Sequence, residues 1–387
     1  MLITPAMPIP AVFSTPRTAI MTVFAGFGVA VGAIAGSMPT VARQAGLDDR
    51  TLGLAITCFS IANLAALVLG GKLASRASNR AMLMVTTPLF ALFTIVTLTA
   101  NSPVSFTLAY VLFGIAAGLT DLFMNAEGTA IELDQGRPIF TTFHGSVSTG
   151  LTVMALLASY LSTQVSPLAT ALVASAVLLL GMVLAKRNLR PRQLAIAHAA
   201  RMSTIPNRRG LIVLGLVAGL SVSAETAAIL WSAKLLDTQA PALAAIAGLG
   251  AAFFGLCNAM VRFPGDRLRA RFGDLPLMMG SIIVAVAGFA VLGFSTGFAA
   301  SVAGFALVGL GTAIIFPCIV ALAAGLVPQN KAGAISFVSL LSAGPRIISP
   351  WAFGVISAAL GISFAFGLFA CAMLIALALV FILQRLR

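Results

Sequence analysis

Runs of apolar residues, each close to 20 residues long, alternate with short polar connections along this chain. A helix that crosses the hydrocarbon core of a bilayer needs about 20 apolar residues. Twelve such runs are present and predict twelve transmembrane helices, which makes the fold class an all-α membrane protein. Their approximate bounds are 18–41, 51–71, 80–100, 104–130, 139–163, 167–186, 210–236, 242–262, 275–296, 299–325, 332–358 and 362–384.

The longest connection is basic, carries Pro191 and Pro206, and divides the predicted helices six and six. A trace of a repeat supports this division, because GKLASRAS at 71–78 and DRLRARFG at 266–273 lie 195 residues apart. Parallel six-helix halves around a central path are a known transporter architecture. The expected parts are a flexible cytoplasmic tail over 1–17, a six-helix bundle over 18–186, a basic cytoplasmic linker over 187–209 and a second six-helix bundle over 210–387.

The composition excludes a soluble domain and changes how the net charge is interpreted. The chain is 60% hydrophobic and only 9% charged, whereas soluble domains carry about 25% charged residues. With a cytoplasmic N-terminus, 19 of the 23 Lys and Arg residues fall on the cytoplasmic side and 3 on the other. This bias obeys the positive-inside rule and places both termini in the cytoplasm. It also accounts for most of the net charge of +13 without a nucleic-acid partner.

Motifs for catalysis or cofactor binding are missing from the sequence. The four cysteines stand singly in apolar runs, there are only two histidines, and no Walker motif or Ser-His-Asp spacing occurs. The glycine pairs lie inside predicted spans with no strand before them, so they are not nucleotide loops. We therefore expect no enzyme activity, no cofactor and no metal.

A polar stripe crosses the fourth predicted helix, which is otherwise almost wholly apolar. Asp121, Asn125, Gly128 and Glu132 are spaced by 4, 3 and 4 residues, so they fall within roughly 60° on one helix face. Such groups are costly in lipid and should face protein or a water-filled cavity. Glu127 and Asp134 point to a second face, where they are expected to be solvated or paired with loop arginines.

The two ends of this stripe differ in predicted depth. Glu132 should lie at the cytoplasmic mouth, close to Arg137 in the next loop and to His144 at the start of the fifth helix. These three residues are interpreted as a gate network, with a static interfacial cluster as the alternative. Asp121 and Asn125 lie deeper and should line the path. Asp121 is the candidate for the coupling proton; a substrate acceptor or a structural partner are the alternatives.

The second half offers two charges near the middle of its helices, Glu225 and Arg346. An isolated charge at that depth costs at least ~2.5 kcal/mol on insertion scales, so each should have a partner. They could pair with each other, permanently or only in the resting state. Alternatively Arg346 could bind a carboxylate or phosphate of the substrate through its planar fork, and Glu225 could share the proton-coupling role.

Uncharged polar and aromatic residues complete the candidate path. Asn63 and Ser148 could line its first half. Trp231, near the outer end of the seventh helix, is either an interfacial belt residue or an outer cap over the cavity.

Three stretches of the sequence resemble a known family. They are D-x-x-M-N-x-x-G at 121–128; G-R-P at 136–138 followed by Phe143-His144; and Glu225 followed by Trp231-Ser232, AGLGAAFF and G-D-R-L at 265–268. With twelve spans and basic loops after spans 2 and 8, the chain resembles the major facilitator superfamily, and within it the branch named for the rhizopine-associated membrane protein MosC. The resemblance implies two rocking six-helix bundles and a sugar- or cyclitol-like substrate.

The sequence also departs from that family pattern. The usual Asp of the two repeated loops is replaced by Ser75 and Ala270, which implies that other pairs hold the cytoplasmic gate; Arg76 and Arg271 of the same loops are candidate gate residues. Members of the MosC branch often have an acidic residue just before the tryptophan of the seventh span, where this chain has Leu230. The fifth span lacks the G-P-x-x-G-G signature of many drug/proton antiporters.

The sequence thus favours a monomeric secondary active transporter in the cell (inner) membrane. It would move a small polar metabolite, sugar- or cyclitol-like or an organic acid, by alternating access, with a proton as co-substrate. Alternatives are an efflux pump for drugs or amphipathic metabolites, a non-transporting sensor on the same fold and, least favoured, a membrane-embedded enzyme.

Overall fold

The computed structural model describes residues 15–74, 77–136, 139–192 and 207–386. Twelve helices in these ranges are long and apolar enough to cross a membrane, which confirms the predicted count. The predicted N-terminal tail and most of the predicted linker lie outside the described residues. In chain order the elements are α1 (Pro16–Gln44), α2 (Asp49–Ala74), α3 (Asn79–Leu98), α4 (Pro103–Gln135), α5 (Phe140–Gln164), α6 (Pro167–Asn188), α7 (Arg208–Gln239), η3 (Pro241–Ile246), α8 (Leu249–Arg262), α9 (Gly265–Phe272), α10 (Asp274–Phe294), α11 (Phe298–Thr312), α12 (Ile315–Leu326), η4 (Pro328–Asn330), α13 (Lys331–Leu360) and α14 (Ile362–Leu386).

The tenth predicted span is interrupted, because α11 ends at Thr312 and α12 begins at Ile315. Pro317 explains the break: it has no N–H to bond the carbonyl of Ala313, and its ring crowds that carbonyl. The eighth span also begins irregularly, with the short 3₁₀ helix η3 before α8.

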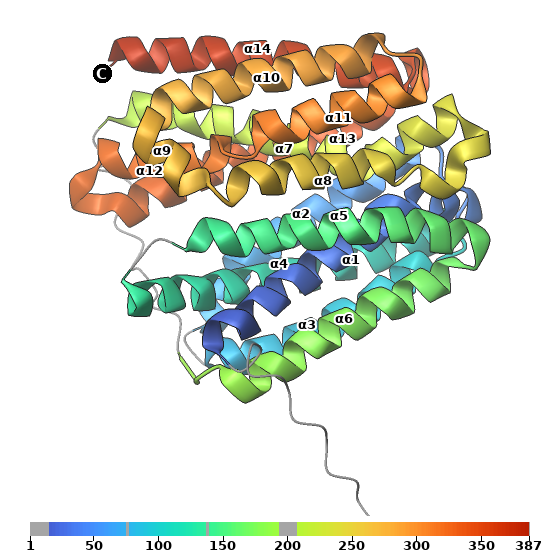
Figure 1. Ribbon diagram of the computed structural model, residues 1–387, viewed down its shortest axis with the longest axis horizontal. Coiled ribbons are helices and arrows are strands. Elements are labelled where there is room, and N and C mark those ends of the chain that lie inside the picture. Colours follow the sequence, from blue (N-terminus) through green and yellow to red (C-terminus); the bar gives the residue numbers. More distant parts are fainter. Residues whose placement is uncertain (1–14, 75–76, 137–138, 193–206, 387) are drawn as a thin grey trace, which may run out of the picture.

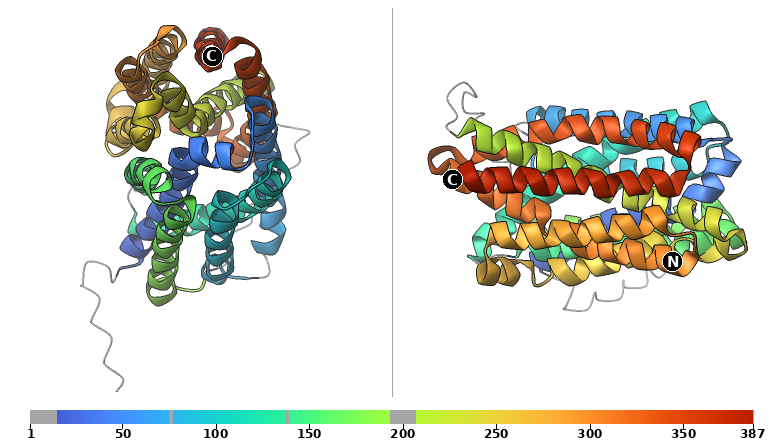
Figure 2. Two further views of the ribbon diagram at one scale, coloured as in Figure 1. Left: turned by 90° about the vertical axis from the view of Figure 1, so that its right-hand side faces the viewer. Right: turned by 90° about the horizontal axis from the view of Figure 1, so that it is seen from above.

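The helices form two bundles that lie side by side with their axes roughly parallel (Figures 1 and 2). We call α1–α6 the first half and the elements from α7 to α14 the second half. In the first half α1 packs on α5, α2 on α4 and α3 on α6; in the second half α7 packs on α13, α8 on α11 and α10 on α14.

Glycine permits the closest approach within the first half, between α1 and α5. A Cβ atom built on Gly28 would lie 1.9 Å from the carbonyl oxygen of Val147, and one on Gly36 would lie 2.1 Å from that of Ala155. Both distances are far below van der Waals contact. Any larger residue would push the two helices apart, so the small residues set the helix spacing.

The two halves meet along α5 with α8, α2 with α13, and α1 with α7. We call the end with the α4–α5 and α6–α7 connections the linker end, and the end with the α1–α2 and α5–α6 connections the opposite end. Close to the opposite end, a Cβ on Gly53 of α2 would lie 2.6 Å from the Pro350 carbonyl oxygen and 2.9 Å from Gly354 of α13.

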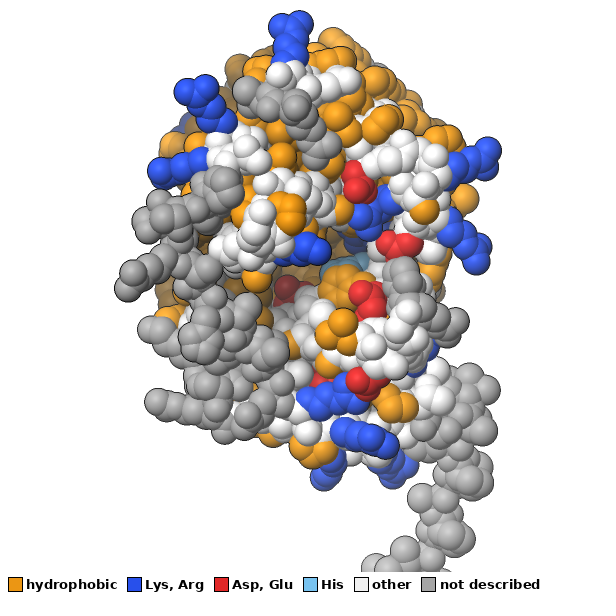
Figure 3. Space-filling model, turned by 90° about the vertical axis from the view of Figure 1, so that its left-hand side faces the viewer, with side chains coloured by type: hydrophobic (Ala, Val, Ile, Leu, Met, Phe, Trp, Pro, Cys, Tyr) orange, Lys and Arg blue, Asp and Glu red, His pale blue; other side chains and the backbone are white. Residues whose placement is uncertain are grey.

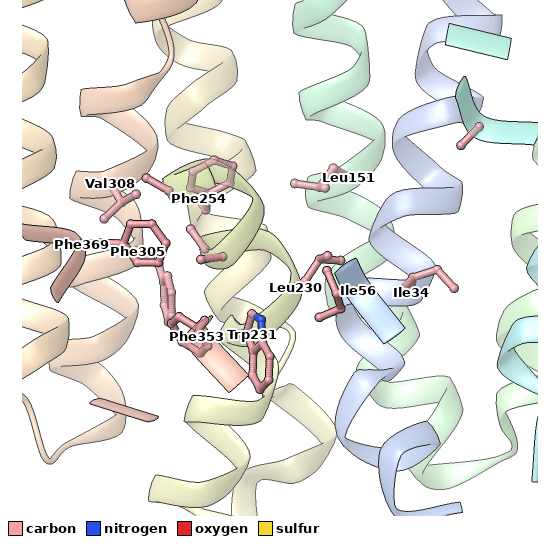
Figure 4. Close-up of a cluster of buried hydrophobic side chains, with 14 of the residues drawn as sticks. Ile34, Ile56, Leu151, Leu230, Trp231, Phe254, Phe305, Val308, Phe353 and Phe369 are labelled. Carbon is pink, nitrogen blue, oxygen red and sulfur yellow. The ribbon is translucent and has the colours of Figure 1, made fainter. Parts of the chain in front are cut away.

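Apolar side chains seal the space between the halves toward the opposite end. Figure 4 shows Leu230 of α7 and Ile56 of α2 reaching into this space beside Ile34 of α1. Leu230 is 5% exposed, and Ile56 and Ile34 are equally well buried. These three residues belong to one hydrophobic core that extends across both halves.

The linker end is more open. Figure 3 looks onto this end and shows a hollow between the two halves, with a histidine and acidic side chains around it. On this side Thr141 Oγ1 donates to Asp266 Oδ2 at 2.7 Å, and Arg262 at the end of α8 donates to Ser148 Oγ of α5 at 3.3 Å, both across the halves. The central space is therefore closed toward one end and hollowed toward the other.

Candidate functional site

A hydrogen-bonded polar row in the first half runs from the middle of α4 to the start of α5. The side-chain amide of Asn125 donates to Asp121 Oδ1 at 2.8 Å, and its oxygen lies 3.1 Å from His144 Nε2. Since an amide oxygen only accepts, His144 Nε2 must carry the hydrogen of this bond. The sequence placed Asp121 and Asn125 on one face but assigned His144 to the gate beside Glu132, whereas the structure bonds His144 to Asn125.

Glu225 and Arg346 do not pair with each other in the structure. Glu225 Oε1 instead lies 3.3 Å from the guanidinium of Arg262, at the end of α8. Arg262 also donates to Ser148 Oγ at 3.3 Å and to the carbonyl of Ala313 at 3.3 Å. Arg262 was missed as a site residue because, as the last residue of its predicted span, it was counted with the loop arginines.

Arg346 lies near the middle of α13, largely buried, and lines a central cavity. No carboxylate of the described residues comes within 4.0 Å of its guanidinium. The carboxyl group of Asp121 is the acid close enough to attract it electrostatically. The cavity is small, with a volume of about 40 Å³, and is lined by Phe59, Ser60, Asn63, Leu64, Thr226, Ala343, Arg346 and Ile347.

The uncharged candidates occupy different places. Asn63 lines the cavity and donates to the carbonyl of Gly114 at 3.3 Å. Ser148 is buried at the interface of the halves, where it donates to Asn258 Oδ1 at 3.0 Å. Trp231 is 1% exposed and packs on Phe353 with ring centroids 4.7 Å apart. The belt interpretation of Trp231 is therefore wrong, since a belt residue would face the headgroups.

The predicted contact between Glu132 and His144 is absent. Glu132 Oε2 accepts from the backbone N–H groups of Ile139 and Phe140 at 2.7 and 2.6 Å, so it caps the start of α5. Arg137 and Arg76 lie outside the described residues, and Arg271 is exposed with its guanidinium over the Phe272 ring. The gate roles of these residues stay a prediction.

Glu132→Ala is expected to lower the free energy of unfolding by about 1–3 kcal/mol, because two backbone donors lose a charged acceptor. A clear fall in the thermal unfolding temperature of the purified protein would be the readout. Asp134→Ala on the same helix is the control: Asp134 is more than half exposed, and its pair with Arg192 at 2.5 Å should contribute about 0–1 kcal/mol. Unchanged stability with altered transport would favour the gate role instead.

The second face of α4 binds the start of the linker. Asp134 pairs with Arg192 as expected for a loop arginine, and this hydrogen bond raises the pKa of the guanidinium. Glu127 is instead buried and accepts from Asn79 Nδ2 at 3.1 Å, while the Asn79 backbone N–H donates to the Arg192 carbonyl at 2.6 Å. These bonds hold α3, α4 and the linker together.

Ion pairs cross between the halves at the opposite end. Arg43 of α1 pairs with Asp237 of α7 at 2.5 Å. Asp49 of α2 pairs with Lys234 of α7 and accepts from Ser357 of α13. The sequence counted Arg43 and Lys234 only as charges on the outer side, because their partners lie about 190 residues away.

Asp49→Asn is expected to favour opening of this end about fivefold, since it weakens two contacts between the halves that together contribute about 1 kcal/mol. The measurement is the labelling rate of a cysteine at Leu230 by a membrane-impermeant maleimide. Asp48→Asn is the matched control, because the side chain of Asp48 accepts hydrogen bonds from Thr51 of its own half and, among the described residues, forms no hydrogen bond or ion pair across the halves. These bonds lower the pKa of the Asp48 carboxyl group. Equal rates in both variants would contradict a closing role for Asp49.

Comparison with known proteins decides the family. The family model described as Major Facilitator Superfamily matches residues 18–234 and 211–387. The chain belongs to this superfamily. The chain is 27% identical to an uncharacterized MFS-type transporter of Yersinia pestis over 361 residues, with 92% of each chain covered. It is 28% identical to the membrane protein MosC of Rhizobium meliloti over 349 residues, covering 89% of this chain and 84% of MosC.

Solved structures of the superfamily share the fold. The nucleoside transporter NupG, in a mutant form, matches with a TM-score of 0.75 at 13% identity, covering 95% of this chain and 99% of NupG. The human organic anion transporter MFSD10 matches with a TM-score of 0.69 at 17% identity, covering 94% and 99%. At these identities the likeness supports the major facilitator fold and nothing about substrate.

Ala270 stands where the superfamily usually has an Asp in the loop after the eighth span, and other polar contacts lie near it. Asp266 accepts from Thr141 across the halves and lies 3.3 Å from Arg269. Arg269 in turn pairs with Asp274 at 2.7 Å. Of these contacts, only that between Thr141 and Asp266 crosses the halves, and both pairs of Arg269 lie within the second half, so the gate role of other pairs stays a prediction.

Proposed function

We propose that this chain is a secondary active transporter that moves a small polar metabolite by alternating access, coupled to protons. The observation that carries the proposal is the mid-depth site. There Asp121, Asn125 and His144 of the first half face Arg346 and the Glu225–Arg262 pair of the second half. Charged groups at this depth are expensive and mark substrate or ion pathways.

The difference between the sealed opposite end and the hollowed linker end supports alternating access. A path that is sealed at the opposite end and hollowed at the linker end is one of the two states that such a cycle needs. The ion pairs of Arg43 and Asp49 would break when the halves rock to the other state. With the linker end proposed as cytoplasmic, from the positions of its Lys and Arg residues, this state is open to the cytoplasm of a bacterial-type inner membrane.

Asp121 is proposed as the coupling group. It sits at the centre of the path, and its carboxyl group is held by a neutral amide rather than by a cation. Such an acid can bind and release a proton as the path opens to either side. Glu225 is the second candidate, but its carboxylate is paired with the guanidinium of Arg262 at 3.3 Å.

Several alternatives receive less support. The charged groups near the centre, which are Arg346 in the cavity wall and the Glu225–Arg262 pair, disfavour a pump for apolar drugs. A non-transporting sensor on the same fold is separated from a transporter by the uptake assay below. Superfamily proteins with this fold are named for nucleosides and for organic anions, so the fold does not choose the substrate. We keep sugars, cyclitols and organic acids as the classes to test.

Uptake into proteoliposomes tests the proposal. Purified protein should accumulate a labelled member of a panel of sugars, polyols and organic acids when a pH gradient, acid outside, is imposed. A protonophore should reduce uptake to equilibration. Accumulation that is unaffected by the protonophore would refute proton coupling, and the absence of any carrier-dependent exchange across the panel would refute transport of these classes.

A further inference from the structure

Arg346 presents an unpaired guanidinium to the central cavity. Its five N–H donors have no hydrogen-bond acceptor among the described residues, and no carboxylate lies within 4.0 Å. A guanidinium stays charged at all accessible pH values and is rarely left without an anionic partner at this depth. The side chain therefore has donors to offer to a ligand.

The other charges of the site are already engaged. Glu225 pairs with Arg262, and Asp121 accepts from Asn125. Asp121 attracts Arg346 electrostatically without contacting it, so a gap separates the two groups. In this conformation neither Glu225 nor Asp121 accepts a hydrogen bond from the guanidinium of Arg346.

From this geometry we infer that the substrate is an organic anion whose carboxylate binds Arg346 in the gap that separates it from Asp121. A planar guanidinium matches a carboxylate with two parallel hydrogen bonds. Beside it, Asn63 and Thr226 can bond hydroxyl groups, and Phe59 offers an apolar face. The inference rests on the transport function proposed above and narrows its substrate class to carboxylic acids with polar groups.

The same placement links the anion to a proton. A carboxylate between Arg346 and Asp121 would be repelled by an ionised Asp121 but can accept a hydrogen bond from a protonated one. The groups that act on Asp121 are Asn125 on its own helix, to which His144 on α5 is bonded in turn, and Arg346 on α13. Helix α2 contributes the neutral Asn63 to the cavity. Anion and proton should bind together, and anion affinity should fall as the pH rises through the pKa of Asp121.

Matched pairs of ligands test this inference by thermal shift of the full-length purified protein. The probes are D-gluconate against D-glucitol, L-lactate against propane-1,2-diol, and 4-hydroxybenzoate against 4-hydroxybenzyl alcohol. At least one acid should raise the unfolding temperature, and its neutral partner should not. Arg346→Lys should weaken the apparent affinity about tenfold or more because the second parallel hydrogen bond is lost, and Arg346→Gln should abolish binding.

Two further variants complete the test. Asp121→Asn, which resembles the protonated acid, should still bind the anion but without pH dependence. Arg187→Gln, a change of the same type at an exposed arginine in the last turn of α6, should leave the shifts unchanged; if Arg346→Gln fails to fold, Arg346→Lys supplies the comparison. Equal shifts by neutral partners, shifts that survive loss of the guanidinium, or no shift with any acid would each overturn the inference.

Transport assays separate this inference from the proposed function. Proton-driven uptake of a neutral polyol that ignores carboxylates would keep the proposed function and overturn the anion assignment. Arg346-dependent binding of a carboxylate without any transport would keep the anion assignment and overturn the proposed transport function.

Discussion

Asp121→Asn is expected to abolish accumulation of substrate against a gradient while leaving exchange at equal concentrations intact. An amide cannot bind and release the coupling proton at physiological pH. The substitution is nearly isosteric, and its amide oxygen can still accept from Asn125 Nδ2, which lies 2.8 Å from Asp121 Oδ1. Loss of coupling should therefore not be accompanied by loss of folding.

The measurement compares two assays on the same proteoliposomes. Uptake driven by an imposed pH gradient should fall from many-fold accumulation to equilibration, and counterflow of labelled substrate should persist. Asp48→Asn, an acid outside the path, serves as the control and should behave like the wild type. Accumulation by Asp121→Asn at the wild-type level would remove Asp121 from the coupling role and make Glu225 the next candidate.

Helix positions and faces were predictable from local periodicity. The fourth span was expected at 104–130, and α4 runs over Pro103–Gln135. Spacing by four residues correctly put Asp121 and Asn125 on one face, because that spacing is a property of the helix itself. Hydropathy did not reveal the break between α11 and α12, since both segments are apolar and the interruption depends on one proline.

Contacts between distant helices could not be obtained in this way. A pair between Glu225 and Arg346 was one of the possibilities because both lie near mid-span, but depth does not give the rotation of a side chain about the helix axis. The partner is Arg262, which approaches from the end of α8. Similarly, Glu132 was expected beside His144, but α4 ends at Gln135 and the backbone N–H groups of Ile139 and Phe140 bind the carboxylate instead.

Gly53→Val is expected to hold the opposite end open and to reduce transport strongly while each half stays folded. The added side chain would collide with the Pro350 carbonyl and with Gly354 only when α2 and α13 are closed. Overpacking of this kind costs about 1–3 kcal/mol, which shifts the ratio of two conformations by roughly 5- to 150-fold. When the opposite end opens, the clash is relieved, so the overpacking destabilises only the conformation in which α2 and α13 are closed.

Distances between spin labels provide the readout. Labels at Arg50 and Ala358, which line one surface pocket at the opposite end, should move apart in Gly53→Val. Gly325→Val is the matched control, because nothing lies within 4 Å of its added Cβ.

Gly28→Val should behave differently from both: its clash with Val147 lies within the first half, so no rocking motion relieves it and folded protein should be lost. A closed distance in Gly53→Val with normal transport would mean that the α2–α13 contact does not have to separate during the cycle.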